Sequence, residues 1–303
     1  TGYIRPQTRL LIPAGALVDL EVLRYELNML RLDPPRVGVD RNAMIIEAED
    51  KDTETGLQLR ERLSSTLCGV GSAVARRALR GRDVRTASVA ARDVPWLGEL
   101  ITNVSDEANS ALDCGKKVLV EGTQGFGLSL YHSDSYPKAT SRDTTAAGFL
   151  SEVGLSPLLV TEIVLVFRTF PIRVAGAQAG PLKDEITWET LQAESGYPYP
   201  IQEMTTVSKK LRRVGRFDWS LAKSSIATNR PSRIVVNGLD YLGYENRGLR
   251  DRELLNPRAA EFLEELENTF DVPVSLCGTS PDVVVETLKC SAGNVVSSVK
   301  ICV

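Results

Sequence analysis

The chain has 303 residues, of which 43% are hydrophobic and 25% are charged, and its net charge at pH 7 is −3. This size allows one large core without help from disulfides or metals. The negative charge argues against general nucleic-acid binding, which needs many cationic contacts to phosphate, and no run approaches the roughly 20 apolar residues of a membrane helix.

The five cysteines are widely spread and form no C-x-x-C pair. This spacing predicts neither a disulfide framework nor a zinc site, and it favours a reducing compartment. Lys and Arg cluster at 76–85 and 209–216, where a local phosphate site is expected. A nucleic-acid surface is the less favoured interpretation, because no aromatic residues for base stacking are interleaved with them.

Short β-branched runs alternate with stretches of helical periodicity, a pattern typical of an α/β fold. The predicted strands lie at 9–12, 43–46, 118–120, 163–167, 233–237 and 274–276. The predicted helices lie at 17–30, 105–113, 147–153 and 257–270. In the first of these helices, residues expected in the core are Leu20, Leu23, Leu27 and Leu30.

Two polar segments interrupt this pattern. Residues 49–56 show no apolar period and are expected to form an exposed loop. Residues 193–200 are rich in Gly and Pro and are expected to be irregular. Neither segment is long enough to separate domains, so we expect one domain over 1–303.

A glycine-rich turn follows the strand predicted at 118–120. Residues 118–127 are VLVEGTQGFG. Ligands of open α/β sheets bind beyond the carboxyl ends of the strands, so Gln124 is expected at the mouth of a site. Its amide can donate to and accept from the six-oxygen and ring nitrogens of a purine. A turn that merely ends a strand accounts for the spacing equally well.

A hydroxyl-rich run leads into the helix predicted at 147–153. Residues 136–146 are YPKATSRDTTA. Hydroxyls and unpaired N–H groups at a helix start make an anion site, so Thr140 and Ser141 are candidates for holding a nucleotide phosphate. Asp143, Thr144 and Thr145 are alternatively explained as caps of the helix, the commoner use of such residues.

Together the two segments resemble the signature of the adenylosuccinate synthetase family, E-G-A-Q followed by Y-P-x-V-T-S-x-x-T. The matching residues are Glu121, Gly122, Thr123, Gln124, Tyr136, Pro137, Thr140, Ser141, Thr144 and Thr145. The resemblance covers nearly the whole chain. Several ordered motifs at compatible spacing are far more specific than any one of them.

The other motifs occur in the family's order. Residues that resemble its G-T-T-G-x-G-x-G segment are Ser65, Thr66, Gly69 and Gly71. Arg80 stands where the family has an arginine that reaches the neighbouring subunit's nucleotide phosphate. Residues 206–215 resemble the aspartate-binding loop T-T-T-G-R-x-R-R-x-G. Residues 237–240 resemble T-K-L-D, whose acid recognises the triphosphate's base, and 278–281 resemble a segment of the same pocket.

The resemblance implies a single α/β domain with a central, mainly parallel sheet flanked by helices, related to the P-loop NTPases. It also implies a ligase. The six-oxygen of IMP or dGMP is phosphorylated by GTP, ATP or dATP with Mg²⁺, and the amine of L-aspartate then displaces the phosphate. Such an enzyme is expected in the cytoplasm, or the host cytoplasm if phage-encoded, as a homodimer in which Arg80 acts across the subunit boundary.

The resemblance also assigns roles to residues, with Gln124 positioning the reacting six-position. Residues implied to bind the purine monophosphate are Ser65, Thr66, Arg80, Gln124 and Thr140. Residues implied to bind aspartate are Thr206, Ser208, Lys210 and Arg212. Residues implied to bind the base of the triphosphate are Asn237, Asp240, Gly278 and Thr279. No metal ligand is assigned within 1–303.

One part of the family pattern has no counterpart here. The amino-terminal G-D-E-G-K-G loop, with its catalytic aspartate, and the following catalytic histidine do not occur in these residues. The chain begins with Thr1 rather than Met, which favours a missing N-terminal segment. The alternative is a nucleotide-binding pseudoenzyme. The single histidine, His132, aligns with a different family position and is not expected to be the catalyst.

Several departures concern the substrates. Asn237 and Gly238 replace Thr and Lys of T-K-L-D, which leaves GTP and ATP or dATP open. Lys210 replaces an arginine, and lysine cannot offer a bidentate fork to a carboxylate. Lys138 replaces an apolar or aromatic residue, which leaves IMP and dGMP open. These departures resemble the archaeal branch and the phage homologues of the aminoadenine pathway, which aminate dGMP.

Overall fold

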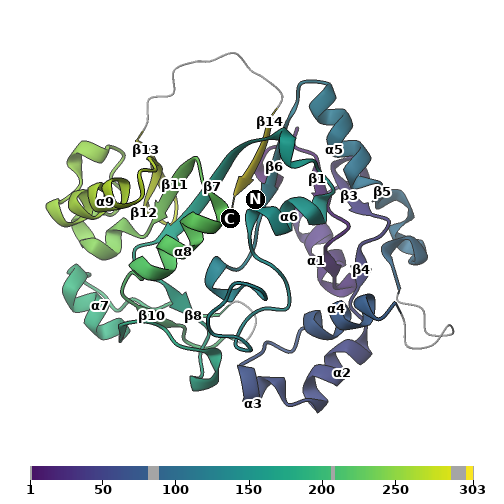
Figure 1. The fold of residues 1–303 in the computed structure, drawn as a ribbon, viewed down its shortest axis with the longest axis horizontal. Coiled ribbons are helices and arrows are strands. Elements are labelled where there is room, and N and C mark those ends of the chain that lie inside the picture. Colours follow the sequence, from purple (N-terminus) through teal and green to yellow (C-terminus); the bar gives the residue numbers. More distant parts are fainter. Residues whose placement is uncertain (1, 81–88, 206–208, 288–297, 303) are drawn as a thin grey trace.

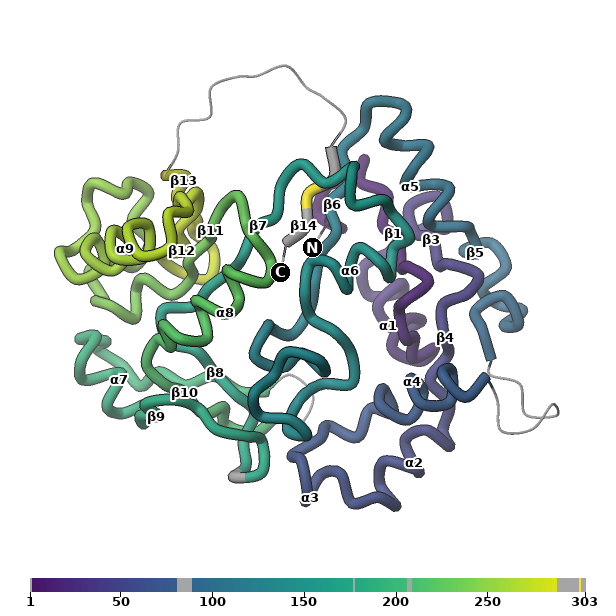
Figure 2. The backbone as a smooth tube through the Cα atoms, in the orientation of Figure 1, coloured from purple at the N-terminus to yellow at the C-terminus, as the bar shows by residue number. Residues whose placement is uncertain are grey.

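A computed structural model describes residues 2–80, 89–205, 209–287 and 298–302. Helices surround a large central sheet, as the α/β prediction expects (Figure 1). The tube view places the first third of the chain on one side, the last third on the other and the teal middle segment between them (Figure 2). None of the helices in the described ranges is long and apolar enough to cross a membrane.

The central sheet has six strands in the order β13-β12-β11-β7-β14-β6. Their bounds are β6 Lys117–Glu121, β7 Val160–Arg168, β11 Arg233–Asn237, β12 Val274–Ser280, β13 Val283–Glu286 and β14 Ser298–Cys302. Each neighbouring pair is parallel except β12 and β13. The carboxyl ends of the parallel strands therefore lie at one end of the sheet, where ligands of such folds bind.

Smaller sheets flank the central one. Parallel pairs join β1 Leu10–Ile12, β3 Val37–Asp40 and β5 Ile101–Thr102, and likewise β2 Leu17–Val18 and β4 Met44–Ile45. An antiparallel sheet has the order β8-β10-β9, with β8 Ile172–Arg173, β9 Glu185–Ile186 and β10 Arg213–Gly215. Strand β10 is the end of the predicted aspartate loop at 206–215, so its pairing with β8 and β9 brings that end toward residues 172–186.

Helices cover the sheets with their apolar faces. Outside residues 48–78, the α-helices of the described residues are α1 Leu20–Leu30, α5 Val104–Asp113, α6 Ala146–Val153, α7 Trp188–Ser195, α8 Trp219–Asn229 and α9 Pro257–Phe270. In α9, Leu263 and Leu266 are fully buried and pack in the same core as Ile234 and Val236 of β11. The helix begins where the Asn256 side chain accepts from the Ala259 N–H, as an N-cap does.

Two predicted boundaries are adjusted by local pairing. The helix predicted from residue 17 begins at Leu20, because residues 17–18 pair with β4 and the Asp19 carboxylate caps the helix. Segment 193–200 is irregular from Gly196 onward. Gly196 ends α7 in the left-handed region, with φ of 69°.

The prediction of an exposed loop at 49–56 is wrong. Residues Ala48–Gly56 form helix α2, which precedes α3 Leu59–Leu63 and α4 Val70–Ala78. Glu47 and Asp50 form a capping box at its start. The inward side of α2 carries carboxylates, Asp50 and Glu54, each only 3% exposed. A helix whose buried face is acidic has no apolar period, so the pattern could not reveal it.

Candidate functional site

The glycine-rich turn follows β6 at the carboxyl end of the central sheet. Gln124 is exposed and has a left-handed backbone, with φ of 73°. The carbonyl of Gly125 accepts a hydrogen bond of 3.0 Å from the Thr144 hydroxyl. A non-glycine residue in this conformation is uncommon and persists where its surroundings hold it. The hydrogen bond from Thr144 thus fixes the backbone of the turn, while Gln124 remains exposed.

The turn and the hydroxyl-rich run lie side by side. The Thr140 N–H donates to the Leu128 carbonyl at 2.8 Å, and the Leu130 N–H donates to the Arg142 carbonyl at 3.0 Å. Leu128 is four positions after Gln124, so the two are at most about 14 Å apart, and the 3₁₀ turn Phe126–Leu128 shortens this distance further. This separation is compatible with one nucleotide contacting both Gln124 and Thr140.

The end of the hydroxyl-rich run caps α6. The Thr145 hydroxyl accepts from the Gly148 N–H at 3.1 Å and donates to Asp143 Oδ2 at 2.6 Å, while Asp143 Oδ1 accepts from Ser129. The capping interpretation is therefore right for Thr145, whose hydroxyl Asp143 holds, whereas the Thr144 hydroxyl bonds to the Gln124 turn. Thr140 and Ser141 are not part of the cap. They remain the candidates for a phosphate.

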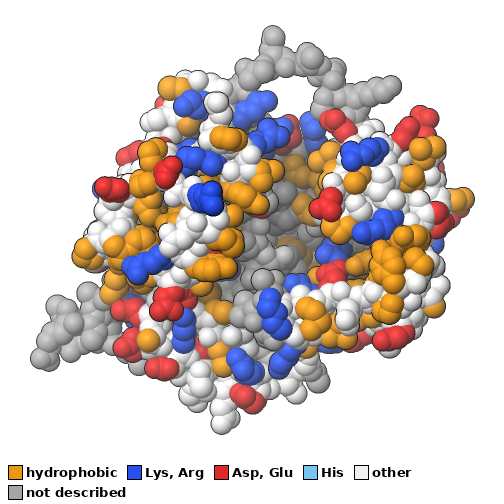
Figure 3. All heavy atoms as spheres, turned by 180° about the vertical axis from the view of Figure 1, so that it is seen from behind, with side chains coloured by type: hydrophobic (Ala, Val, Ile, Leu, Met, Phe, Trp, Pro, Cys, Tyr) orange, Lys and Arg blue, Asp and Glu red, His pale blue; other side chains and the backbone are white. Residues whose placement is uncertain are grey.

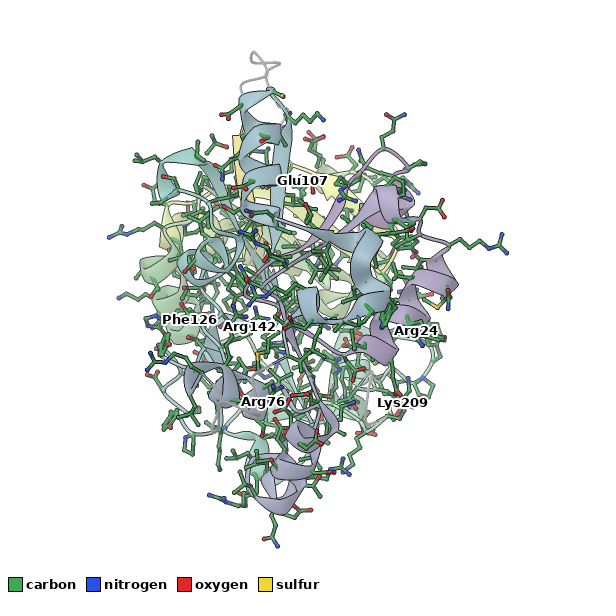
Figure 4. The ribbon with its side chains drawn as sticks, turned by 90° about the vertical axis from the view of Figure 1, so that its right-hand side faces the viewer. Arg24, Arg76, Glu107, Phe126, Arg142 and Lys209 are labelled. Atoms are coloured by element: carbon green, nitrogen blue, oxygen red, sulfur yellow. The ribbon has the colours of Figure 1, made fainter. Side chains whose placement is uncertain are left out.

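His132 packs against the same turn. Its ring stacks on Phe126 with centroids 5.9 Å apart and an interplanar angle of 13°. Figure 4 labels Phe126 and Arg142 of the neighbouring run, which lie at about the same height in side view. The stacking gives His132 a packing contact with the turn that carries Gln124.

A buried carboxylate closes the start of α4. Glu54 Oε2 accepts from the Gly69 N–H at 2.9 Å, and Oε1 accepts from Gly71 at 2.9 Å and Ser72 at 3.4 Å. A side chain at Gly71 would collide with the Ser141 hydroxyl and with Glu54. Glu54 therefore occupies the anion site at the start of this helix, where Gly71 lies close to Ser141 of the hydroxyl-rich run.

Ion pairs hold the same two helices together. Arg76 of α4, labelled in Figure 4, pairs with Asp50 at 2.7 Å and with Glu47 at 2.5 Å. Asp50 is almost fully buried, and such a charge is stable in the fold only when paired. The segment that carries Ser65 and Thr66 is thus anchored at its α4 end.

Ser65 and Thr66 line a cavity of about 250 Å³ together with Lys210. Gly176 and its neighbours, which follow β8, also line this cavity. Residues predicted to bind the monophosphate and a residue predicted to bind aspartate therefore share one cavity. Seen from behind, the surface is hollowed between the two sides of the molecule, with Lys, Arg and hydrophobic side chains around the hollow (Figure 3).

The predicted aspartate loop is closed by its own backbone. The Thr205 N–H donates to the Lys210 carbonyl at 2.8 Å, and the Lys210 N–H donates to the Thr205 hydroxyl at 2.9 Å. Lys209, labelled in Figure 4, has φ of 50°, the conformation that a glycine adopts without strain. Arg212 donates to the Met204 carbonyl at 3.3 Å. Thr206 and Ser208 lie outside the described residues.

The predicted base-binding residues gather at the ends of β11 and β12. Asn237 and Gly278 are register partners, and the Asn237 side chain occupies the space beside Gly278 that a Cβ would need. Thr279 is fully buried, and its hydroxyl donates to the Leu249 carbonyl at 2.8 Å. Thr279 therefore fixes the wall of this region, whereas Asn237 is partly exposed at the end of its strand.

Asp240 is held in a buried polar network. Its Oδ2 accepts from the Tyr197 hydroxyl and, at 3.2 Å, from Arg247. Burial raises the pKa of Asp240, while these hydrogen bonds and the nearby Arg247 charge oppose the shift. Burial and the hydrogen bond to Asp240 raise the pKa of Tyr197, so it remains a protonated donor.

Arg80 is separate from the cavity. It follows α4 in a left-handed conformation, with φ of 56°, and is exposed at the end opposite the Glu54 contact. Other members of the basic clusters are neutralised within the fold. Arg213 pairs with Glu185 and Arg216 with Glu194, each at 2.5 Å.

The family model of adenylosuccinate synthetase matches residues 94–247. The adenylosuccinate synthetase of Pyrococcus horikoshii is 40% identical over 285 residues, which cover 93% of this chain and 80% of that protein. This chain belongs to the adenylosuccinate synthetase family. The adenylosuccinate synthetase of Methanocaldococcus jannaschii is 39% identical over 285 residues, covering 93% of this chain and 78% of that protein.

Solved structures agree with the adenylosuccinate synthetase assignment. The succinoaminodeoxyadenylate synthetase (PurZ) of cyanophage S-2L, bound to dGMP and dATP as an energy donor, gives a TM-score of 0.72 at 27% identity and covers 94% of this chain and 79% of that chain. The fully ligated Plasmodium falciparum adenylosuccinate synthetase gives 0.78 at 17% identity, covering 95% and 87%, a likeness of fold. The predicted family, fold and carbon–nitrogen ligase class are confirmed, and the pseudoenzyme alternative is not favoured.

Two residues that organise this adenylosuccinate synthetase site were not predicted from the sequence. Glu54 falls in the segment interpreted as a loop, and only its spacing of four residues from Asp50 hints at a shared helix face. Tyr197 falls in the irregular segment, where no pattern indicates its contact with Asp240. Both act through tertiary contacts, which local periodicity does not encode.

Replacing Glu54 tests how strongly the phosphate segment is anchored. Glu54→Ala is expected to lower the free energy of unfolding by about 1–3 kcal/mol, because buried N–H groups at the start of α4 lose their acceptor. Urea unfolding measures the change. The matched control is Glu49→Ala on the exposed side of the same helix, with an expected change within about 0.5 kcal/mol. Equal effects of the two substitutions would contradict the anchoring role.

Proposed function

We propose that this protein joins L-aspartate to C6 of a 6-oxopurine nucleoside monophosphate, IMP or dGMP, through a 6-phosphoryl intermediate. The observation that carries the proposal is the cavity shared by Ser65, Thr66 and Lys210. Hydroxyls suited to a phosphate and an ammonium suited to a carboxylate line one space there. A reaction between two bound substrates gains from such closeness, because it replaces a bimolecular encounter.

The proposed reaction has two steps. The six-oxygen of the purine attacks the γ-phosphorus of the triphosphate, the purine loses its N1 proton, and the nucleoside diphosphate leaves. The aspartate amine then attacks C6, inorganic phosphate leaves with the former six-oxygen, and the amine loses a proton. Phosphorylation is needed because an oxygen bound only to carbon is a poor leaving group.

Each predicted residue has a place in this scheme. Gln124 holds the six-position of the purine, and Ser65, Thr66 and Thr140 hold its phosphate. Residues proposed to meet the aspartate carboxylates are Thr206, Ser208, Lys210 and Arg212. We assign no acid–base catalyst among residues 1–303. The work of these residues is to orient the substrates and to neutralise charge.

The sheet order supports a triphosphate lying along the carboxyl end of the strands. Strands β14 and β7 stand between β6 and β11. At the usual strand spacing, the ends of β6 and β11 are about 14 Å apart. A triphosphate with its base near Asn237 and Gly278 then extends toward the Gln124 turn, where the six-oxygen is proposed to bind.

The environment of Asp240 bears on the choice of donor. A guanine is recognised by a carboxylate that accepts from two N–H groups of the base. Oδ2 of Asp240 already accepts from Tyr197 and Arg247, and the side chain is 7% exposed. Gly238 also supplies no lysine side chain to cover the base. We therefore favour ATP or dATP over GTP as the donor.

Mg²⁺ belongs to the proposal because it neutralises phosphate charge in phosphoryl transfer. Within the described ranges, no group of three or more His, Cys, Asp or Glu residues fits a metal ion. We therefore assign no ligand to Mg²⁺ and derive no step through it. We place the enzyme in the cytoplasm, or in a host cytoplasm if phage-encoded, where the reduced cysteines expected from their spacing are stable.

Product formation tests the proposed reaction. The protein expressed from its complete reading frame, given aspartate, Mg²⁺ and ATP, dATP or GTP, is expected to convert IMP or dGMP to a succinylated nucleotide. Mass spectrometry of the product and release of inorganic phosphate provide the two measurements, and omission of aspartate is the control. Monophosphate binding without product in every combination contradicts the ligase and supports a nucleotide-binding pseudoenzyme.

We propose further that two copies form a two-fold dimer in which Arg80 of each chain reaches the monophosphate of the other. The nine residues of α4 extend about 13 Å between the Glu54 contact and Arg80. The exposed Arg80 therefore lies beyond the end of α4 that is farther from Ser65 and Thr66. In a two-fold dimer the same contact occurs twice, so both sites are completed reciprocally.

Subunit mixing tests the action of Arg80 across the boundary. Arg80→Ala and Gln124→Ala are each expected to lose most activity. An equal mixture that exchanges subunits is expected to recover about a quarter of the wild-type activity, because half of the dimers are mixed and each mixed dimer has one intact site. Activity of the mixture and sedimentation of each variant are measured. No recovery, with all variants dimeric, contradicts action across the boundary.

A further inference from the structure

Glu203 connects the start of the aspartate loop to two other elements of the site. Its Oε1 accepts from the guanidinium of Arg168, the last residue of β7, and from the Tyr241 hydroxyl at 3.2 Å. Its backbone carbonyl accepts from the Arg212 N–H at 2.8 Å, which joins the two flanks of the loop. One residue thus contacts the loop, the sheet and the turn after β11.

Tyr241 carries this connection to the predicted base-binding turn. It belongs to the 3₁₀ turn Leu239–Leu242 and follows Asp240 directly. Its ring packs against Trp188 and Tyr197, with centroids 6.3 and 6.0 Å away. Trp188 in turn donates its indole N–H to the Arg212 carbonyl at 2.7 Å. The aromatic group therefore touches both the base-binding turn and the second flank of the loop.

The charges and the partial burial of Glu203, Arg168 and Tyr241 strengthen the contacts between them. The side chains of Glu203 and Arg168 are 25% and 38% exposed, so the pair is only partly screened by water. Burial and the negative charge of Glu203 raise the pKa of Tyr241, so its hydroxyl stays a donor. Hydrogen bonds to a charged group are the stronger class. By contrast, the Thr205 and Lys210 bonds close only the loop itself.

We propose that Glu203 is a positioning residue that fixes the aspartate loop against the triphosphate-base turn. It contacts neither substrate and acts through Arg212 and the loop that carries Lys210. The inference rests on the proposed function, because it assumes that this loop receives aspartate. Loss of Glu203 leaves the monophosphate cavity wall at Ser65 and Thr66 intact, since none of the described Glu203 contacts reaches those residues.

Steady-state kinetics separate this role from a general loss of structure. Glu203→Ala is expected to raise KM for aspartate about tenfold, the factor that corresponds to about 1.4 kcal/mol, with KM for the monophosphate changed less than about twofold. Glu203→Gln keeps an oxygen that can accept from Arg168 and Tyr241, so its KM for aspartate is expected between those of the wild type and Glu203→Ala.

A second variant tests the hydrogen bond between Tyr241 and Glu203 by changing the donor. Tyr241→Phe removes only the hydroxyl that donates to Glu203 and keeps the packed ring. It is expected to raise KM for aspartate about threefold, and the double variant with Glu203→Ala is expected to be no worse than Glu203→Ala alone. Tyr241→Phe also keeps the test valid if Glu203→Ala does not fold.

Glu194→Ala is the matched control. Glu194 pairs with Arg216 and Arg258, and its side chain is 31% exposed, close to the 25% of Glu203. It is expected to leave all KM values unchanged.

If the wild-type protein forms no succinylated product, the proposed function itself is contradicted, independently of any variant. Active wild type whose KM for aspartate is unaffected by Glu203→Ala and by Tyr241→Phe overturns the positioning role. Equal increases in KM for every substrate also overturn it.

Discussion

Parallel pairing of β6, β14, β7 and β11 is the constraint on which the site depends. Because the four strands run in the same direction, the turns that follow them emerge at one end of the sheet. This places the Gln124 turn, Arg168 and Asn237 at that end, although Gln124 and Asn237 are more than 100 positions apart in the sequence. The cavity lined by Ser65, Thr66 and Lys210 is formed by residues that lie outside the central sheet.

Carboxylate side chains fix the loops of the site that the central sheet does not position. Glu54 accepts from N–H groups at the start of α4, Glu203 connects the aspartate loop to β7 and Tyr241, and Asp240 ties its turn to Tyr197. Each acid is partly or largely withdrawn from water, where an unpaired charge would be strongly destabilising. Each carboxylate is therefore stable only beside its own hydrogen-bond donors. This requirement fixes each loop in one position.

Much of this arrangement could be predicted from sequence, because apolar runs mark buried strands and family motifs mark their ends. The strand at 233–237 and the helix at 257–270 were predicted at their observed bounds, and Thr145 was correctly considered as a cap. Helix α2 could not be predicted, since Asp50 and Glu54 supply its buried face and leave no apolar period. The sharing of one cavity by Thr66 and Lys210 likewise depends on tertiary packing, which spacing along the chain does not reveal.

In the proposed reaction, one cavity receives both the phosphate of the purine nucleotide and the carboxylates of aspartate. A crystal structure with aspartate and either IMP or dGMP tests it most directly. We expect phosphate oxygens within hydrogen-bond distance of Ser65 or Thr66, an aspartate carboxylate at Lys210, and the six-oxygen beside Gln124. A purine nucleotide bound away from the Ser65 and Lys210 cavity, or an aspartate that never contacts the loop, would contradict it.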